Sequence, residues 1–291
     1  MRLAQHAGRV LLVTVDDDTA VDTAESVAVA DVAAASGGRF GPDPMTVFEH
    51  WGQFSRWFGT ASVAPTHRLD RNQLDAPVPR PRQILAVGVN YAAHAVEAKG
   101  RNPSFFSKLP PCVVGPQATV ELPTTTVDWE VEMVAVLSRH AFRVPAEQAW
   151  SYVAGLMVGQ DLAERASQFE GELPQFSLAK SRPGFGPTGP WLTTVDEIDD
   201  PADLAICCMR NGEVVQSDRT AGMVQGVDAL IATVSAAVPL FPGDLLFTGT
   251  PGGTGHRRNP EVFLAPGDVL SSTIEGLGRI EQRFVAGSGL R

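Results

Sequence analysis

Two glutamates in one short apolar segment, Glu130 and Glu132, are the residues of this chain best suited to chemistry. They lie in a run from Thr125 to Leu137 whose side chains alternate with period two and are otherwise apolar on both faces, which predicts a strand buried on both sides. Two like charges one pleat apart in such a strand are costly unless a cation or a raised pKa relieves them. A hard divalent metal ion held by oxygen ligands is the simplest relief.

A third carboxylate could complete this site. Asp161 follows an apolar stretch, and we interpret Ala146 to Gly159 as a buried helix that ends just before it. Three carboxylates would leave about three of the roughly six oxygen positions that Mg²⁺ prefers open to water and a chelating oxo acid. The alternative is that the three acids are exposed or paired with basic side chains, and spacing alone does not separate the two interpretations.

A histidine and a glutamate could supply acid–base chemistry. His94 and Glu97 are three residues apart on a short helix predicted from Tyr91 to Ala98, so they share one face. The carboxylate could orient the imidazole or relay its proton, as general-base catalysis requires. The alternative is a solvated surface pair.

Lysine is rare in this chain. Only Lys99, Lys108 and Lys180 are lysines among the 23 basic residues, which indicates positions that need a compact charge or a movable pKa. Lys180 precedes a glycine- and proline-rich run, residues 183–190, that we predict to be a structured loop.

A second glycine-rich loop runs from Gly249 to Gly255 and lacks the spacing of a dinucleotide-binding loop. It could present backbone N–H groups and the Thr250 hydroxyl to a carboxylate, or be an ordinary surface turn. Arg257 and Arg258 follow it and could pair with a second carboxylate of a substrate. The alternative is that both arginines are solvated loop charges.

Composition narrows the class of protein. With 291 residues, 44% hydrophobic, the chain is typical of a globular protein, and its net charge of -10 argues against nucleic acid as a partner. No apolar run approaches the roughly 18 residues that cross a membrane, and the amino terminus lacks the apolar core of a signal peptide. The three cysteines form neither a disulfide framework nor a metal motif, so we expect a cytoplasmic location.

A proline-punctuated stretch, residues 76–82, divides the chain because it cannot sustain a helix. We predict a small N-terminal α/β domain over residues 1–75 and a larger domain over residues 83–291. The elements predicted in the first are a strand at Arg9–Val15 and helices at Thr19–Ala35 and Pro44–Phe58. Those predicted in the second include a strand at Ile84–Val89, a hairpin turning at Asn211-Gly212 and a helix at Asp228–Val238.

Taken in order, these pieces resemble the fumarylacetoacetate hydrolase family, in particular its bacterial acylpyruvase and 2-hydroxyhepta-2,4-diene-1,7-dioate isomerase branch. The matching segments, within roughly residues 84–285, are Gly88–Glu97, Pro103–Lys108, Asp128–Met133, Gly159–Arg165 with Gln168, Lys180-Ser181, Asn211–Glu213 and Pro242–Pro251. The acidic strand, the Asp161 loop and the lysine together form the specific part of this signature. Gln160, Ala166 and Arg182-Pro183 depart from the commonest family pattern.

The resemblance implies an α+β fold, with a mixed β-roll or pseudo-barrel catalytic domain behind the small N-terminal domain. It also implies a homodimer, Mg²⁺ or Mn²⁺ as cofactor, and a small 2-oxo acid as substrate. The residues it assigns are Glu130, Glu132 and Asp161 to the metal, His94, Glu97 and Lys180 to catalysis, and Arg165, Gln168, Thr250 and Lys108 to substrate binding.

For the reaction, the resemblance favours hydrolysis of a carbon–carbon bond in an acylpyruvate through a metal-bound enolate. His94 would activate water, and Lys180 with its neighbours would stabilise the oxyanion. Two alternatives within the family are isomerisation of a 2-hydroxy-diene dioate and decarboxylation of oxaloacetate in aromatic catabolism. The alternative outside enzymology is a metal-binding protein without catalytic activity.

Overall fold

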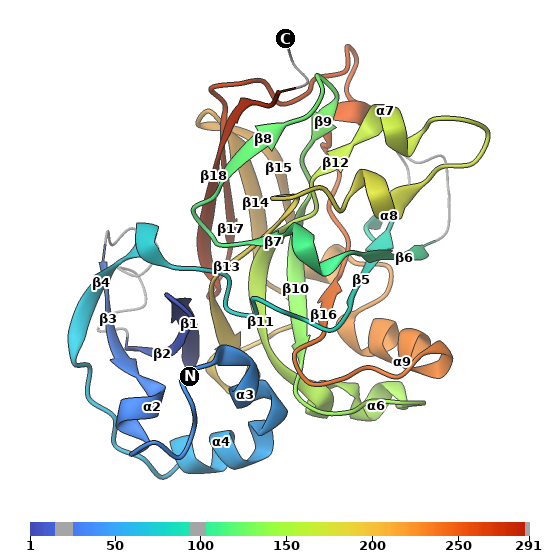
Figure 1. Cartoon of the computed structure of the whole chain (residues 1–291). Helices are drawn as coiled ribbons and strands as arrows, with labels where there is room; N and C mark the ends of the chain where they lie inside the picture. The colour runs from blue at the N-terminus through green and yellow to red at the C-terminus, as the bar shows by residue number, and fades with distance from the viewer. Residues whose placement is uncertain (15–25, 93–102, 289–291) are drawn as a thin grey trace.

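The computed structural model describes residues 1–14, 26–92 and 103–288 (Figure 1). Within them, mixed sheets of eleven and five strands and an antiparallel pair of strands combine with short helices. The strands are β1 (Arg2–His6), β2 (Arg9–Thr14), β3 (Ser26–Asp31), β4 (His67–Asp70), β5 (Ile84–Gly88), β6 (Ser104–Lys108), β7 (Val113–Val114), β8 (Thr119–Leu122), β9 (Val127–Asp128), β10 (Val131–Leu137), β11 (Val153–Gln160), β12 (Ala163–Glu164), β13 (Gly186–Thr194), β14 (Ala205–Arg210), β15 (Glu213–Arg219), β16 (Leu245–Phe247), β17 (Val269–Ile274) and β18 (Gly278–Ala286). The α-helices are α2 (Val32–Ala35), α3 (Pro44–Glu49), α4 (Trp51–Phe58), α6 (Ala146–Ala149), α7 (Arg165–Gln168), α8 (Phe176–Ala179) and α9 (Val227–Ala237).

The largest sheet runs in the order β4-β3-β2-β1-β13-β11-β10-β16-β5-β6, with β7 beside β13. The combination of mixed sheets and helices confirms the predicted α+β class. Among the described residues, this sheet has two separate ends, so it is open rather than a closed barrel. Strand β1 pairs antiparallel with β13, so the first four strands extend the same sheet that contains β10 and β11. The domain division at residues 76–82 stays a prediction.

The centre of the large sheet is strand β10. All seven of its residues are buried, and it pairs antiparallel with β11 on one side and β16 on the other. Strand β11 is equally buried and comes so close to its neighbours that a Cβ on Gly159 would lie 2.5 Å from Val134 Cγ2. The two central strands are therefore fixed by packing on every side, which is what a precise site at their ends requires.

Three predicted elements are wrong. The helix predicted from Ala146 to Gly159 is helical only at its start, and its apolar part is strand β11. The part of the predicted helix Thr19–Ala35 within the described residues is mostly strand β3. The loop predicted at residues 183–190 becomes strand β13 from Gly186 onward. The first two runs are buried on both faces, so they have no period that separates a strand from a helix, and pairing in the sheet decides. In β13, pairing with β1 and β11 overrides a glycine- and proline-rich composition that is typical of a loop.

Several local predictions are confirmed. The hairpin turns at Asn211 and Gly212, which adopt the positive φ angles of 52° and 83° that this turn needs. Helix α9 falls where Asp228–Val238 predicts it, and the aromatic helix Pro44–Phe58 is present as α3 and α4, interrupted at His50.

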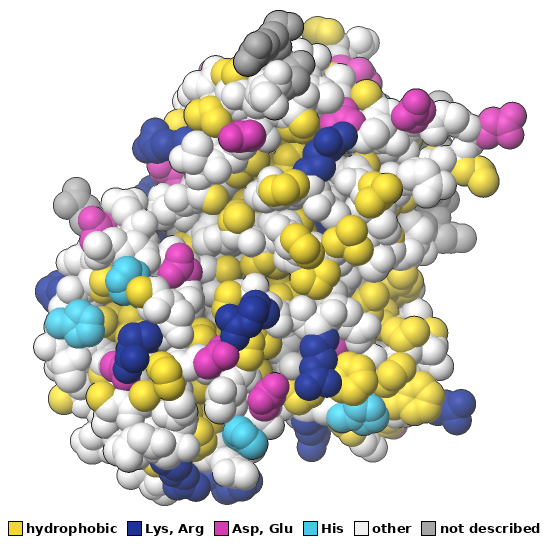
Figure 2. All heavy atoms as spheres, viewed as in Figure 1, with side chains coloured by type: hydrophobic (Ala, Val, Ile, Leu, Met, Phe, Trp, Pro, Cys, Tyr) yellow, Lys and Arg dark blue, Asp and Glu magenta, His cyan; other side chains and the backbone are white. Residues whose placement is uncertain are grey.

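The surface carries scattered charges. On the face shown in Figure 2, basic and acidic side chains lie singly or in small groups among hydrophobic and other atoms. None of the helices in the described ranges has the length and apolar character that crossing a membrane requires.

Candidate functional site

Strand register brings three carboxylates together. The run predicted as one strand breaks into β9 and β10 at Trp129-Glu130, so Glu130 immediately precedes β10 and Glu132 lies within it. Asp161 immediately follows β11, whose end lies opposite the start of β10, and its backbone N–H donates to the Glu130 carbonyl at 2.9 Å. Ligand oxygens of the three side chains lie within 4.8 Å of one another, and all three residues are buried.

Two lysines meet these carboxylates. The Lys180 ammonium, after α8, donates to Glu130 Oε2 at 2.7 Å and to Asp161 Oδ2 at 2.6 Å. Lys108, from β6, donates to Asp161 Oδ1 at 2.6 Å and to the backbone oxygens of Lys180 and Phe185. Although burial disfavours the charged form, Asp161 and Glu130 raise the pKa of Lys180, so it remains a cation.

Arg165 is the third cation of the centre. It lies at the start of α7, and its Nη2 donates to Glu130 Oε1 at 2.6 Å while Nη1 donates to Gln168 Oε1 at 2.8 Å. Glu164 precedes it and caps the short helix by accepting hydrogen bonds from the backbone N–H groups of Ala166 and Ser167. Local capping therefore places Arg165 and Gln168 on the side of α7 that faces the carboxylates.

The charged form of Glu132 is disfavoured at its position in the centre. Burial, and then the charges of Asp161 and Glu130, raise the pKa of Glu132 well above its usual range. Among the described residues, the Gly249 backbone N–H donates a hydrogen bond to Glu132 Oε2 at 2.8 Å. A divalent cation would offset this repulsion, and three carboxylates are the oxygen donors that Mg²⁺ and Mn²⁺ prefer, so the residues present fit such an ion.

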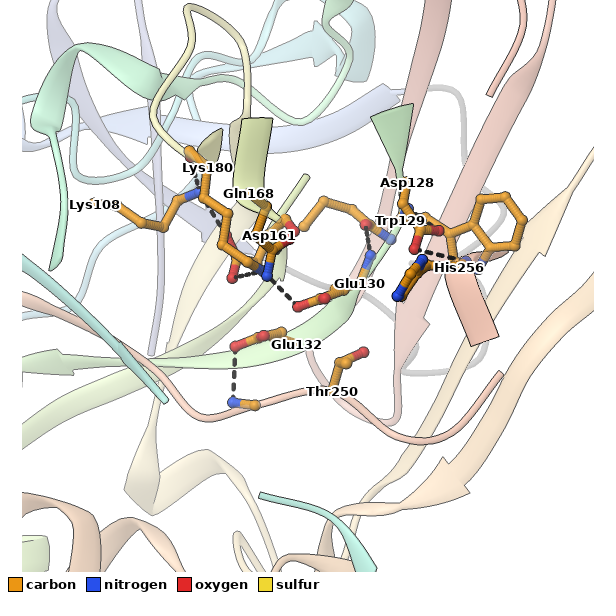
Figure 3. A network of polar contacts seen from close by, with 12 residues as sticks. Lys108, Asp128, Trp129, Glu130, Glu132, Asp161, Gln168, Lys180, Thr250 and His256 are labelled. Carbon is orange, nitrogen blue, oxygen red and sulfur yellow. Dashed lines mark hydrogen bonds and ion pairs between the residues drawn. The ribbon is translucent and has the colours of Figure 1, made fainter. Parts of the chain in front are cut away.

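A fourth buried carboxylate, Asp128, was missed as a candidate site residue although it opens the acidic motif. It accepts five hydrogen bonds, from the backbone N–H groups of Trp129, Gly255 and His256 and from two nitrogens of Arg165. A Cβ on Gly255 would lie 2.8 Å from Asp128 Oδ1, so glycine permits this close approach. Asp128 thereby ties the glycine loop to the arginine of the centre (Figure 3).

The glycine loop lies against the acidic strand and is not an ordinary surface turn. The carboxylate to which Gly249 presents its N–H is the protein's own Glu132. Thr250 lines the pocket at the centre, but its hydroxyl donates to the Val131 carbonyl at 2.8 Å and accepts from Gln216. To donate a hydrogen bond to a substrate oxygen, the Thr250 hydroxyl must therefore share or give up its bond to the Val131 carbonyl.

The pocket beside the centre contains residues predicted for the site and others, such as Phe169 and His256, that the sequence did not indicate. It is lined by Val87, Gly88, Val89, Glu130, Arg165, Gln168, Phe169, Phe176, Lys180, Thr250, Thr254, His256 and Arg257. Figure 3 shows His256 close to Asp128 and Glu130. No sequence spacing connects His256 to the acidic strand, because they are more than a hundred residues apart. The predicted pair His94 and Glu97 lies outside the described residues.

This chain is similar to proteins of known family and fold. Residues 83–285 match the family described as fumarylacetoacetate (FAA) hydrolase, C-terminal. The human protein named oxaloacetate tautomerase FAHD2A, mitochondrial, is 42% identical over 252 residues, covering 84% of this chain and 80% of that protein.

Two solved structures have the same fold over nearly the whole chain. An HpcE-like protein from Mycobacterium smegmatis is 48% identical with a TM-score of 0.91, and the match covers 99% of this chain and 100% of that chain. Maleylpyruvate hydrolase from Sphingobium sp. SYK-6, solved with manganese(II) and pyruvate, is 27% identical with a TM-score of 0.75 over 99% of this chain and 100% of that chain. The chain therefore belongs to the fumarylacetoacetate hydrolase family.

Proposed function

We propose that this protein is a divalent-metal-dependent enzyme that interconverts the keto and enol forms of a 2-oxo acid, with oxaloacetate as the first candidate. The observation that carries the proposal is the cluster of buried carboxylates, Glu130, Glu132 and Asp161, with Lys180 and Arg165 against it. A relative 42% identical over most of the chain is named an oxaloacetate tautomerase. Tautomerisation therefore takes precedence here over carbon–carbon hydrolysis, which the motifs alone favoured.

In this proposal, Glu130, Glu132 and Asp161 hold Mg²⁺ or Mn²⁺. When bound, the ion supplies a Lewis acid that polarises the 2-oxo group. Lys180 and Arg165 place positive charge where negative charge develops on the substrate oxygens, and they act in a buried site where such charge is effective. Gln168 is fixed by Arg165 and is offered to the same pocket.

Keto–enol exchange also requires that a proton be added to or removed from carbon 3. We propose His94, oriented by Glu97, for this transfer on the basis of their spacing in the sequence. The mitochondrial name of the human relative gives the predicted cytoplasmic location no support.

Hydrolysis of an acylpyruvate is the second candidate. The Sphingobium structure, named a maleylpyruvate hydrolase and solved with manganese(II) and pyruvate, shares the fold at 27% identity. Both reactions need the same polarised 2-oxo acid, and hydrolysis adds attack by water on a distal carbonyl. The histidine and glutamate needed to activate that water are present in the sequence.

The test follows the loss of the ultraviolet absorption of freshly dissolved enol-oxaloacetate, with Mg²⁺ and with EDTA. Proton NMR of fumarylpyruvate and acetylpyruvate under the same conditions reports hydrolysis. We expect metal-dependent acceleration of enol loss, abolished in Glu132→Gln and retained in Glu147→Gln, a matched change at an exposed position. Pyruvate release from an acylpyruvate without acceleration of enol loss would assign the protein to the hydrolases instead.

A further inference from the structure

The pocket beside the acidic centre has a second wall, made of Phe169, His256 and Arg257. In Figure 3, His256 lies on the Asp128 side of Glu130, whereas both lysines lie on the other side. The pocket therefore continues past Glu130, from the carboxylate cluster to side chains that the proposed reaction does not use.

His256 is held from several sides. Its ring stacks on Phe169, with centroids 4.8 Å apart and planes 25° apart, and its Nδ1 lies 2.9 Å from Glu261 Oε1. Its backbone N–H donates to Asp128 at 3.0 Å. With Nδ1 facing Glu261, Nε2 is the ring nitrogen that remains for a bound group.

Two arginines act on the charge of His256. Burial, and then the positive charges of Arg165 and Arg257, lower the pKa of His256, while Glu261 and Asp128 act in the opposite direction. A bound carboxylate would offset the repulsion among these basic groups, because it adds negative charge where they converge.

The structure separates two adjacent arginines that the sequence leaves equivalent. Arg257 is half-buried and lines the pocket. Arg258 is exposed, donates from Nη2 to the Val215 carbonyl at 2.9 Å, and lies 5.7 Å from the ring centroid of Trp129. Arg258 thus provides a matched control for any effect of charge in this loop.

We propose that His256 and Arg257 form a subsite for the second carboxylate of a dicarboxylic 2-oxo acid whose 2-oxo end is held at the acidic centre. This assignment rests on the proposed function, because it takes the acidic centre as the place where the 2-oxo end binds. His256 offers Nε2 to the bound carboxylate while its Nδ1 faces Glu261, and Arg257 adds a charged donor. The subsite selects diacids over monoacids of the same length.

The experiment measures binding rather than turnover. Mg²⁺-loaded protein is titrated calorimetrically with 2-oxoglutarate and with 2-oxopentanoate, in which a methyl group replaces the distal carboxylate. We expect the wild type to prefer the diacid, and Arg257→Gln and His256→Gln each to weaken diacid binding about tenfold or more, as loss of a charge-assisted hydrogen bond predicts. Monoacid binding stays unchanged, Arg257→Lys restores part of the loss, and Arg258→Gln behaves as the wild type.

Three outcomes would overturn the subsite: equal binding of both acids by the wild type, equal weakening of both acids in the Arg257 and His256 variants, or the same loss in Arg258→Gln. The result is separable from the proposed function. A diacid preference that depends on Arg257, in a protein that does not accelerate enol loss, would keep the subsite and refute tautomerisation. Acceleration of enol loss by a protein whose diacid preference does not depend on Arg257 would support tautomerisation and refute the subsite.

Discussion

Ion pairs of the same length lie in two very different parts of this molecule. Lys180 and Asp161 approach to 2.6 Å in the acidic centre with side chains only 2% and 1% exposed. Arg80 and Asp43 also approach to 2.6 Å, on the surface, with side chains 61% and 49% exposed. Exposed pairs contribute about 0–1 kcal/mol, whereas removal of one partner of a buried pair leaves an uncompensated charge. Burial rather than distance therefore decides what each pair does.

The largest effect is expected when the buried cluster loses its bridging cation. Lys180→Met should lower turnover at least about a hundredfold and reduce the stability of the metal-free protein by about 3–5 kcal/mol. Because the carboxylates lose a competing positive charge, their affinity for Mn²⁺ should rise. Steady-state kinetics, urea unfolding and calorimetric Mn²⁺ titration measure the three effects, and weaker Mn²⁺ binding would contradict this account of the centre.

The next effect comes from the residue that connects the centre to the glycine loop. Asp128→Asn keeps the shape but replaces an acceptor of five hydrogen bonds by an amide that cannot accept all of them. We expect about 2–3 kcal/mol of lost stability, and a KM raised about tenfold because Arg165 loses its fixed direction. An unchanged KM in the folded variant would show that Asp128 stabilises the loop without positioning the arginine.

A smaller effect should appear at Glu164, the buried cap of α7, and it should depend on pH. Burial raises the pKa of Glu164, but hydrogen bonds from Ser167, Thr126 and Thr124 outweigh burial and lower this pKa to about 2, below the ordinary 4.5. The unfolded chain therefore takes up the proton first, and the stabilisation is present above about pH 4.5 and lost as the pH falls toward 2. Glu164→Gln should cost about 1 kcal/mol at neutral pH. Urea unfolding of both proteins across this range should show the difference vanish, and a constant difference would refute the charge effect.

The smallest effect is expected at the exposed pair. Arg80→Gln should change the free energy of unfolding by less than about 1 kcal/mol and leave turnover unaltered. Urea unfolding in low and high salt measures it. A loss as large as that of Lys180→Met would erase the contrast between the two regions.

The acidic centre was predictable because the cost of its charges is visible in the sequence. Glu130 and Glu132 interrupt a run that is otherwise apolar, and that conflict calls for a cation in any fold. Asp161 was predicted to follow a helix but follows a strand. The prediction failed there because β11 is buried on both faces and its apolar residues have no period that identifies a strand. The strand still ends where the helix was expected to end, so the carboxylate keeps its place.

The rest of the pocket depends on contacts between distant parts of the chain. Asp128 and Gly255 meet only because β9 and the glycine loop are folded against each other, and His256 follows from that contact. Arg257 and Arg258 have the same chemistry in the sequence, and only the backbone direction of the short turn at Gly255–Arg257 separates them. Such differences are set by tertiary packing, which a single sequence does not display.

The pairing of β1 with β13 bears on how this protein can be shortened. Leu3 lies opposite Leu192, so β1 covers the C-terminal part of one edge of β13, the strand next to β11. A fragment trimmed to the family-matching residues 83–285 would expose that edge as a row of unpaired backbone groups, ready to pair with the same strand of another molecule. The first strand thus protects the large sheet from aggregation, and solubility is the property that truncation at this end should change first.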